Sequence, residues 1–128
     1  MNRTLRITAA ALTAALVAVP ALPAVAKDGD VIRRGNCSGS TDWKLKASPE
    51  DGRIEVEGEI DSNKNGQSWN WKLKHNGALS AKGSATTKAP SGSFSVRRVM
   101  VDISGTDTFV FVATNPANGE TCRGTVQF

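Results

Sequence analysis

Apolar and polar residues alternate in short runs along most of this 128-residue chain, and clusters of turn-forming residues separate the runs. In 43–47 the apolar residues alternate with lysines, and in 54–60 they alternate with glutamates. Residues 49–52, Pro-Glu-Asp-Gly, provide a turn between these two runs. Residues two apart point to the same face of a strand, so the alternation predicts strands with one buried face. Helical periodicity is nearly absent after residue 27, and the mature chain is therefore predicted to be all-β.

Five further runs bring the predicted number of strands to seven. Trp69, Trp71 and Leu73 form the inward row of the third strand, and His-Asn-Gly at 75–77 favours a hairpin turn after it. The remaining predicted strands are 78–86, 94–103, 108–114 and 121–128.

The apolar residues of the fifth strand change parity halfway along it. The residues before and after the change are Phe94 and Val96, then Val99, Val101 and Ile103. This change predicts a β-bulge around Arg97-Arg98, because one extra residue would return the later side chains to the buried face.

The predicted chain has seven short strands, a tryptophan on the third and a long fifth strand that leads into Phe-Val-Phe-Val at 109–112. This pattern resembles an immunoglobulin-like or fibronectin-III-like sandwich over about 41–128. The resemblance implies a seven-stranded antiparallel β-sandwich in which the third, sixth and seventh strands share a sheet. The chain departs from antibody-type domains, because Val56 and Phe111 stand where the inter-sheet cysteines are expected. Phe109 likewise stands at the position of the corner tyrosine, without its hydroxyl.

The start of the chain predicts export. Arg3 and Arg6 precede an apolar stretch at 7–19, and Ala-Val-Ala at 24–26 matches a signal-peptidase site. Residues 1–26 are therefore predicted to be a signal peptide, which makes the mature protein secreted and extracellular. It should comprise an N-terminal segment, 27–40, and one β-sandwich domain, 41–128. No later segment approaches the roughly 18 apolar residues of a spanning helix, so no membrane span is expected.

The only two cysteines lie near the two ends of the predicted mature chain. In a small exported domain a pair of thiols is usually a disulfide, so Cys37 and Cys122 are predicted to pair and tie 27–40 to the last strand. The chain also resembles small, uncharacterised secreted proteins of actinomycetes, with a similar Cys-Ser-Gly opening, Trp-Lys-Leu-Lys strand and Gly-Glu-Thr-Cys ending. This resemblance implies export and one disulfide, and it brings no established activity.

Charge and motifs favour neither nucleic-acid binding nor catalysis. The formal charge of +4 includes Arg3 and Arg6, so the mature chain carries only +2. No phosphate loop and no hydrolase or metalloprotease motif occurs, and no cofactor is expected. The glutamates of the second strand share a face, but cations expected across the ladder would depress their pKa values, the wrong direction for a general acid. These residues are Glu55, Glu57 and Glu59, with Lys44, Lys46, Arg97 and Arg98 opposite. The protein is expected not to be an enzyme.

One loop partly matches a calcium site. Asp61 to Gly66 has oxygen-bearing side chains at the first, third and fifth positions and glycine at the sixth. The twelfth position is Lys72, which supplies no carboxylate, so a calcium loop and an ordinary polar loop both stay open. His75, the sole histidine, has no metal-ligand neighbours in sequence and is expected to be a solvated turn residue. No other metal site is predicted.

The three tryptophans raise a carbohydrate-binding hypothesis. Exposed Trp43, Trp69 and Trp71 would stack on sugar rings. Each lies in an apolar row, however, and periodicity favours burial between the sheets.

A second candidate surface is the outer face of the sheet that carries the sixth strand. Val110 and Val112 point away from Phe109 and Phe111, and polar residues of neighbouring strands should surround them, as in binding faces with a polar rim. These neighbours are Asn70, Lys72, Lys74, Arg123 and Thr125. A buried central strand that favours valine on both sides is the alternative explanation.

Taken together, these features predict a secreted, monomeric, non-catalytic β-sandwich that binds an extracellular protein or an envelope ligand through this face or through its end loops. Two alternatives stay open. One is a small-molecule carrier that resembles the chromoprotein apoproteins of actinomycetes, although those use two internal disulfides. The other is a secreted enzyme inhibitor, with 88–92 or 115–119 as its exposed loop.

Overall fold

The computed structural model describes residues 29–128, so the predicted signal peptide, 1–26, lies outside the described residues. From Gly29 onward the regular structure consists of eight strands. They are β1 (Val31–Asn36), β2 (Asp42–Glu50), β3 (Arg53–Asp61), β4 (Ser68–His75), β5 (Ala78–Thr86), β6 (Ser93–Val101), β7 (Thr108–Thr114) and β8 (Thr121–Gln127). The prediction of an all-β chain is confirmed for this part of the sequence. Within it, no helix is long and apolar enough to cross a membrane.

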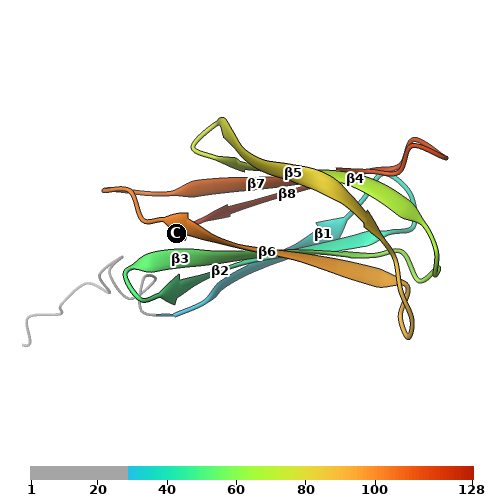
Figure 1. The fold of residues 1–128 in the computed structure, drawn as a ribbon, viewed down its shortest axis with the longest axis horizontal. Helices are drawn as coiled ribbons and strands as arrows, with labels where there is room; N and C mark the ends of the chain where they lie inside the picture. Colours follow the sequence, from blue (N-terminus) through green and yellow to red (C-terminus); the bar gives the residue numbers. More distant parts are fainter. Residues whose placement is uncertain (1–28) are drawn as a thin grey trace, which may run out of the picture.

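The strands form two antiparallel sheets that pack face to face (Figure 1). One sheet has the order β1-β2-β3-β6 and the other has the order β5-β4-β7-β8. The predicted β-sandwich is confirmed, but it has eight strands rather than seven. The additional strand, β1, lies within the segment 27–40 and pairs with β2 from Val31 opposite Ala47 to Asn36 opposite Asp42.

The predicted bulge in β6 is wrong. This strand pairs with β3 without a register shift, from Ser93 opposite Asp61 to Val101 opposite Arg53. The inward positions along β6 are Phe94, Val96, Arg98 and Met100, all buried except Arg98. Because β6 is an edge strand, the long Arg98 side chain leaves the core sideways, and its guanidinium lies 5.1 Å from the centroid of the Trp71 ring. The outward positions after the arginines therefore stay in solvent, with Val99 45%, Val101 64% and Ile103 45% exposed.

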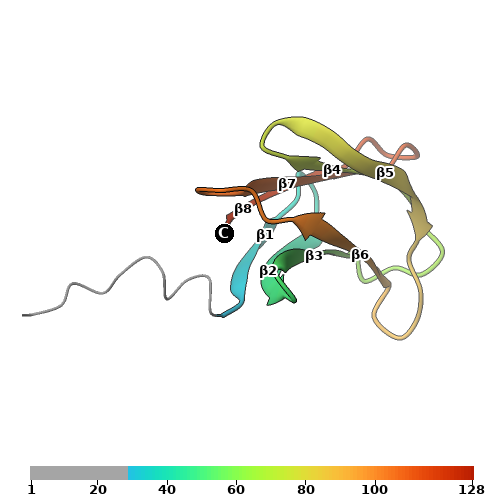
Figure 2. The ribbon, with the colours of Figure 1, turned by 60° about the vertical axis from the view of Figure 1, so that its left-hand side comes forward.

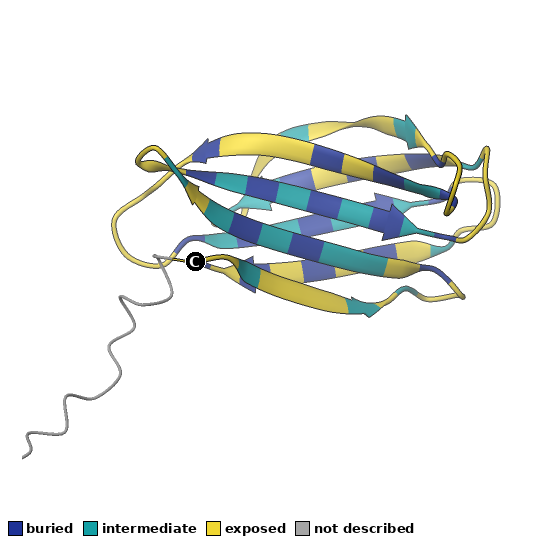
Figure 3. Cartoon of the chain, turned by 90° about the horizontal axis from the view of Figure 1, so that it is seen from below, coloured by how far each residue is buried: buried dark blue, intermediate teal, exposed yellow. Residues whose placement is uncertain are grey.

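The core lies between the two sheets, where every second residue of the central strands is buried. Figure 3 shows this alternation of buried and more exposed positions along the strands. The buried side chains include Leu45, Ile54, Val56, Ile60, Trp69, Trp71, Leu73, Phe109, Phe111 and Val126. The predicted inward rows of β2, β3 and β4 are thus confirmed, and β4 carries two of the three tryptophans into the core.

A tryptophan and a disulfide close the edge of the sandwich where β1 and β8 meet. Gly35 of β1 and Gly124 of β8 lie against the indole of Trp43, since a Cβ on either glycine would lie within 2.7 Å of ring atoms. Nearby, Cys37 and Cys122 form the predicted disulfide, with an S–S distance of 2.01 Å. The bond joins the residue after β1 to β8, so it links the two sheets covalently.

Candidate functional site: the basic face of the second sheet

The pairing register brings all seven predicted binding residues onto the outer face of β5-β4-β7-β8. Lys72 lies opposite Val112, which in turn lies opposite Arg123. The next row joins Lys74 to Val110, and Val110 to Thr125. Asn70 begins a third row, opposite Thr114. Residues separated along the sequence by up to 55 positions therefore form one surface.

Sequence reasoning missed one member of this surface, Lys82 on β5. Lys82 pairs with Lys72, and it extends the row of Lys72, Val112 and Arg123 by one strand. The signal in the sequence was weak, because β5 consists mainly of alanine, glycine and serine and shows little alternation. We call this surface the basic face, defined by Asn70, Lys72, Lys74, Lys82, Val110, Val112, Arg123 and Thr125.

The basic face carries four cations and no acidic residue. The strands β5, β4, β7 and β8 contain no Asp or Glu, and none of the four cations forms an ion pair with a described residue. The two nearest acids in the sequence, Asp107 and Glu120, both accept hydrogen bonds elsewhere, from His75 and Thr41 respectively. The positive charge of this face is therefore uncompensated.

The centre of the basic face is apolar but only partly exposed. Val110 and Val112 are intermediate in burial, whereas Lys72 and Arg123 beside Val112 are exposed. A depression of about 280 Å³ lies there, lined by Asn70, Lys72, Val112 and Thr114. One of its walls is held by a hydrogen bond that the Ser84 hydroxyl donates to Asn70 Oδ1 at 2.8 Å. The face thus has a partly buried apolar centre and a polar rim, with this depression beside Val112.

The outer face of the other sheet differs in charge, because cations and acids alternate across its strands. Lys44 lies opposite Glu59, Lys46 lies opposite Glu57, and Arg97 donates a hydrogen bond to Glu55 Oε2 at 2.6 Å. The bond from Arg97 is the main reason that the pKa of Glu55 lies below its usual range. The expected cross-strand pairing is therefore found here, except that Arg98 occupies an inward position.

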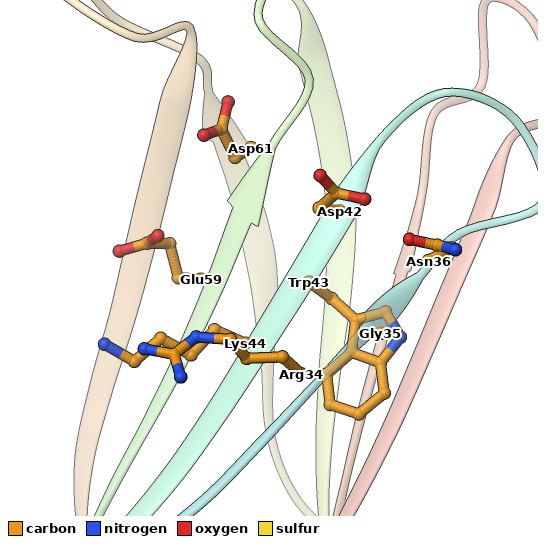
Figure 4. A pocket seen from close by; sticks show the side chains of 8 residues that line it. All are labelled: Arg34, Gly35, Asn36, Asp42, Trp43, Lys44, Glu59 and Asp61. Carbon is orange, nitrogen blue, oxygen red and sulfur yellow. The ribbon is translucent and has the colours of Figure 1, made fainter.

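A hollow of about 540 Å³ lies on this charge-paired face, over β1, β2 and β3 (Figure 4). Its lining residues are Arg34, Gly35, Asn36, Asp42, Trp43, Lys44, Glu59 and Asp61. Figure 4 shows the side chains of Asn36, Asp42 and Asp61 at one end, and those of Arg34 and Lys44 farther along. Gly35 and Gly124 lie against the indole of Trp43, which is intermediate in burial and lines this hollow. Trp69 and Trp71 are buried, so neither offers the exposed ring that the carbohydrate hypothesis requires.

His75 is not the solvated turn residue that the sequence suggests. Strand β4 extends through His75, which pairs with Phe109 and stacks on its ring with centroids 4.5 Å apart. His75 Nε2 lies 2.6 Å from Oδ1 of Asp107, whose side chain is fully buried. Asp107 is further fixed by backbone hydrogen bonds with Phe128 in both directions. The imidazole thus contacts this carboxylate and this ring, and the pair closes one end of the core.

The loop that partly matches a calcium site is bound to the loop between β5 and β6, beside which it lies in Figures 1 and 2. Thr87 Oγ1 donates a hydrogen bond to the Lys64 carbonyl at 2.6 Å, and Ser62 N donates to the Gly92 carbonyl at 3.0 Å. Asp61 Oδ1 accepts a hydrogen bond from Asn63 N within its own turn. Asp61 and the backbone of this loop therefore make polar contacts within the protein, and no cluster of three metal-ligating side chains occurs in the described residues.

These contacts also hold the loop at 88–92, one of the two loops considered for an inhibitor. Lys88 N donates to the Ser93 carbonyl, and Gly92 N donates to the Lys88 carbonyl, both at 2.9 Å. The other loop, at 115–119, is closed by a bond from Gly119 N to the buried Asn115 at 2.7 Å. Both loops are thus tight turns held by the backbone.

Comparison of the chain with protein-family models, with curated protein sequences and with solved structures returned no significant match. The function proposed below therefore rests on the residues and their arrangement.

Proposed function

We propose that the mature protein is a secreted, non-catalytic module of the immunoglobulin-like kind that binds a partner outside the cell through the basic face. One observation carries the proposal: the strand register gathers four unpaired cations and two central valines on a single face. An apolar centre with a polar rim is the usual anatomy of a recognition surface. The disulfide supports the proposal that the protein works in an oxidising compartment, and the predicted signal peptide supports export to that compartment.

The strand order supports the immunoglobulin-like assignment. In such a domain the first, second and fifth strands share one sheet, and the third, sixth and seventh share the other. The orders β2-β3-β6 and β4-β7-β8 agree with this arrangement. On this assignment β1 is an addition beside the first strand, and β5 lies on the outer side of the third.

The capture of a partner tests the proposal. Mature protein, with its start at Lys27 verified by N-terminal sequencing, is immobilised and exposed to culture medium and envelope extract of the producing cells. Replacement of Val110 and Val112 by threonine keeps β-branching while it makes the centre of the face polar, so capture should fall at least about tenfold with folding retained. Replacement of Val99 and Val101 by threonine is the matched control, because these residues are exposed valines on the other sheet.

Other outcomes of this experiment assign the site elsewhere. Capture that survives the change at Val110 and Val112 but fails in the control contradicts the basic face and assigns binding to β6. If capture is lost only when residues 115–120 or 88–92 are changed, partner binding is assigned to an end loop, as an enzyme inhibitor would require. A small molecule that co-purifies with the protein, and is lost on changes at Asp42 and Lys44, would support a carrier that uses the hollow of Figure 4.

A further inference from the structure

The basic face differs from the rest of the molecule in its charge. Residues 29–128 carry a formal charge of +2, yet the four cations of the basic face alone contribute +4. The remaining surface is therefore net negative by two charges. Six acids lie on the other sheet, and they are Asp42, Glu50, Glu55, Glu57, Glu59 and Asp61. Asp42 lies opposite Asp61, whereas the four glutamates lie opposite cations or bond to one. The sandwich is polarised, with one face purely basic.

The cations are arranged around the valines. Neighbouring strands lie roughly 4.8 Å apart, so the row of Lys82, Lys72, Val112 and Arg123 extends about 14 Å across the sheet. Lys74 lies two residues from Lys72 on the same strand, roughly 7 Å away, and flanks Val110. At the edge of this second row, Leu79 pairs with Lys74 and is 52% exposed. A partner that fits this face needs an apolar centre and carboxylates around it.

We infer that the partner is a protein whose docking surface is apolar at the centre and acidic at the rim. This inference rests on the proposed function and adds the chemistry of the partner. Charge complementarity selects an acidic partner, because the basic face has four cations without a counter-charge of its own. A compact acidic patch suits it better than a long uniform polyanion, because a chain that continued beyond the face would meet the net-negative remainder of the surface.

The aromatic residues also favour a protein partner over a sugar polymer or a single-stranded nucleic acid. Recognition of sugars and of unpaired bases uses exposed aromatic rings. On this sheet the aromatic side chains point into the core, and Trp69, Trp71, Phe109 and Phe111 are at most 5% exposed. The basic face instead offers valine methyl groups, lysine stems, hydroxyls and amides.

The size of the face sets the expected strength of the interaction. Four strands of about eight residues span roughly 20 Å by 25 Å, or about 500 Å² for each partner. A total near 1,000 Å² is typical of transient interactions, and charged rims accelerate association in a salt-dependent way. We expect rapid, reversible binding that weakens as the salt concentration rises.

The test uses a soluble 20-residue peptide with a short Val-Leu centre flanked by glutamates, and a second peptide with lysine at every glutamate position. Amide signals of ¹⁵N-labelled mature protein report where each peptide binds. The glutamate peptide should shift the amides of Lys72, Val112 and Arg123, and the lysine peptide should not. The triple variant Lys72→Gln, Lys82→Gln and Arg123→Gln should weaken binding roughly tenfold, since it removes three of the four cations that attract the glutamates.

The matched control is the triple variant Arg34→Gln, Lys44→Gln and Lys46→Gln, which removes the same number of charges from the other sheet. Its affinity for the glutamate peptide should change less than about twofold. Equal weakening in both variants, or equal binding of both peptides, overturns the inference. Binding of heparin or of a DNA oligonucleotide at the same amides, without binding of the glutamate peptide, also overturns it in favour of a polymer.

Capture of the partner distinguishes failure of this inference from failure of the proposed function. Loss of capture with Val110→Thr and Val112→Thr, but no loss with the triple variant of the basic face, contradicts an acidic partner and leaves the binding face in place. Capture that neither variant reduces contradicts the proposed function itself.

Discussion

The ring of Phe111, on β7, lies directly against Gly58, on β3: a Cβ built on Gly58 would lie 2.8 Å from Cγ and Cδ2 of the ring. The backbone of Gly58 is paired on both sides, with Leu45 of β2 and Val96 of β6. Glycine is a poor strand former, so its presence in a central strand has a steric reason here. The absent side chain lets an aromatic ring of one sheet reach the backbone of the other.

Gly58→Ala is therefore expected to destabilise the fold by about 1–3 kcal/mol, as overpacking of a close-packed core does. Urea unfolding followed by tryptophan fluorescence measures the change. Phe111→Leu in the same background should recover part of the loss, because the smaller side chain leaves room for the methyl group. Strictly additive effects of the two substitutions would contradict a steric clash between these residues.

Trp71→Ala is expected to cost about 3–5 kcal/mol in the free energy of unfolding. Trp71 is 5% exposed, packs near Phe111 with ring centroids 6.3 Å apart and lies beneath the Arg98 guanidinium. The comparison variant Arg98→Met, which keeps a long apolar stem, should lose only about 0.5–1 kcal/mol. A loss below about 1 kcal/mol for Trp71→Ala, combined with lost binding to immobilised glycans, would restore the carbohydrate hypothesis.

The disulfide should be detectable by mass and by stability. Intact mature protein should weigh about 2 Da less before reduction than after it, because disulfide formation removes one hydrogen from each thiol. The bond closes a loop with a sequence separation of 85 residues, so Cys37→Ser with Cys122→Ser should destabilise the fold by roughly 2–5 kcal/mol. Free thiols that react in the native protein, or a covalent dimer, would contradict this pairing.

The strands of the fold were largely predictable because the core is built from alternation that local sequence reveals. In β2, β3 and β4 the apolar residues occupy every second position, and these are the positions that the other sheet covers. The strand β1 was missed because its sequence, Val-Ile-Arg-Arg-Gly-Asn, has no such alternation. The edge strand β1 is stabilised by its pairing with β2 and by the contact between Gly35 and the Trp43 ring. Local periodicity reveals neither of these interactions.

Two side chains were misplaced because their partners are distant in sequence. The bulge in β6 was expected because the apolar residues change parity after Val96, yet Arg98 holds an inward position without a register shift, at the edge of the sheet and over the Trp71 ring. His75 was expected in solvent because its neighbours 76 and 77 form a turn, while Asp107, 32 residues away, fixes its ring. The place of Lys82 on the basic face likewise depends on strand register, because only the pairing of β4 with β5 brings Lys82 opposite Lys72.

Glu120 gives the fold a measurable pH dependence. Its carboxylate accepts hydrogen bonds from Thr41 Oγ1 at 2.6 Å and from Thr41 N at 3.0 Å. Burial raises the pKa of Glu120, but these bonds and one from the backbone of Gly39 outweigh burial and hold the pKa below its ordinary value of 4.5. The folded state therefore binds this proton less readily than the unfolded chain does.

It follows that the stabilisation by Glu120 is fully present above pH 4.5 and is lost as the pH falls through the lower, folded pKa. Glu120→Gln should reduce the free energy of unfolding by roughly 1–2 kcal/mol at pH 7, and the difference from the natural protein should shrink progressively below pH 4.5. Urea titrations at pH 7, 5, 4 and 3 measure this convergence. Thr41→Val, which removes the hydroxyl donor, should show the same trend, and its effect at pH 7 should be less than additive with Glu120→Gln. Parallel pH profiles for the natural protein and Glu120→Gln would show that this carboxylate does not stabilise the 38–41 loop through its charge.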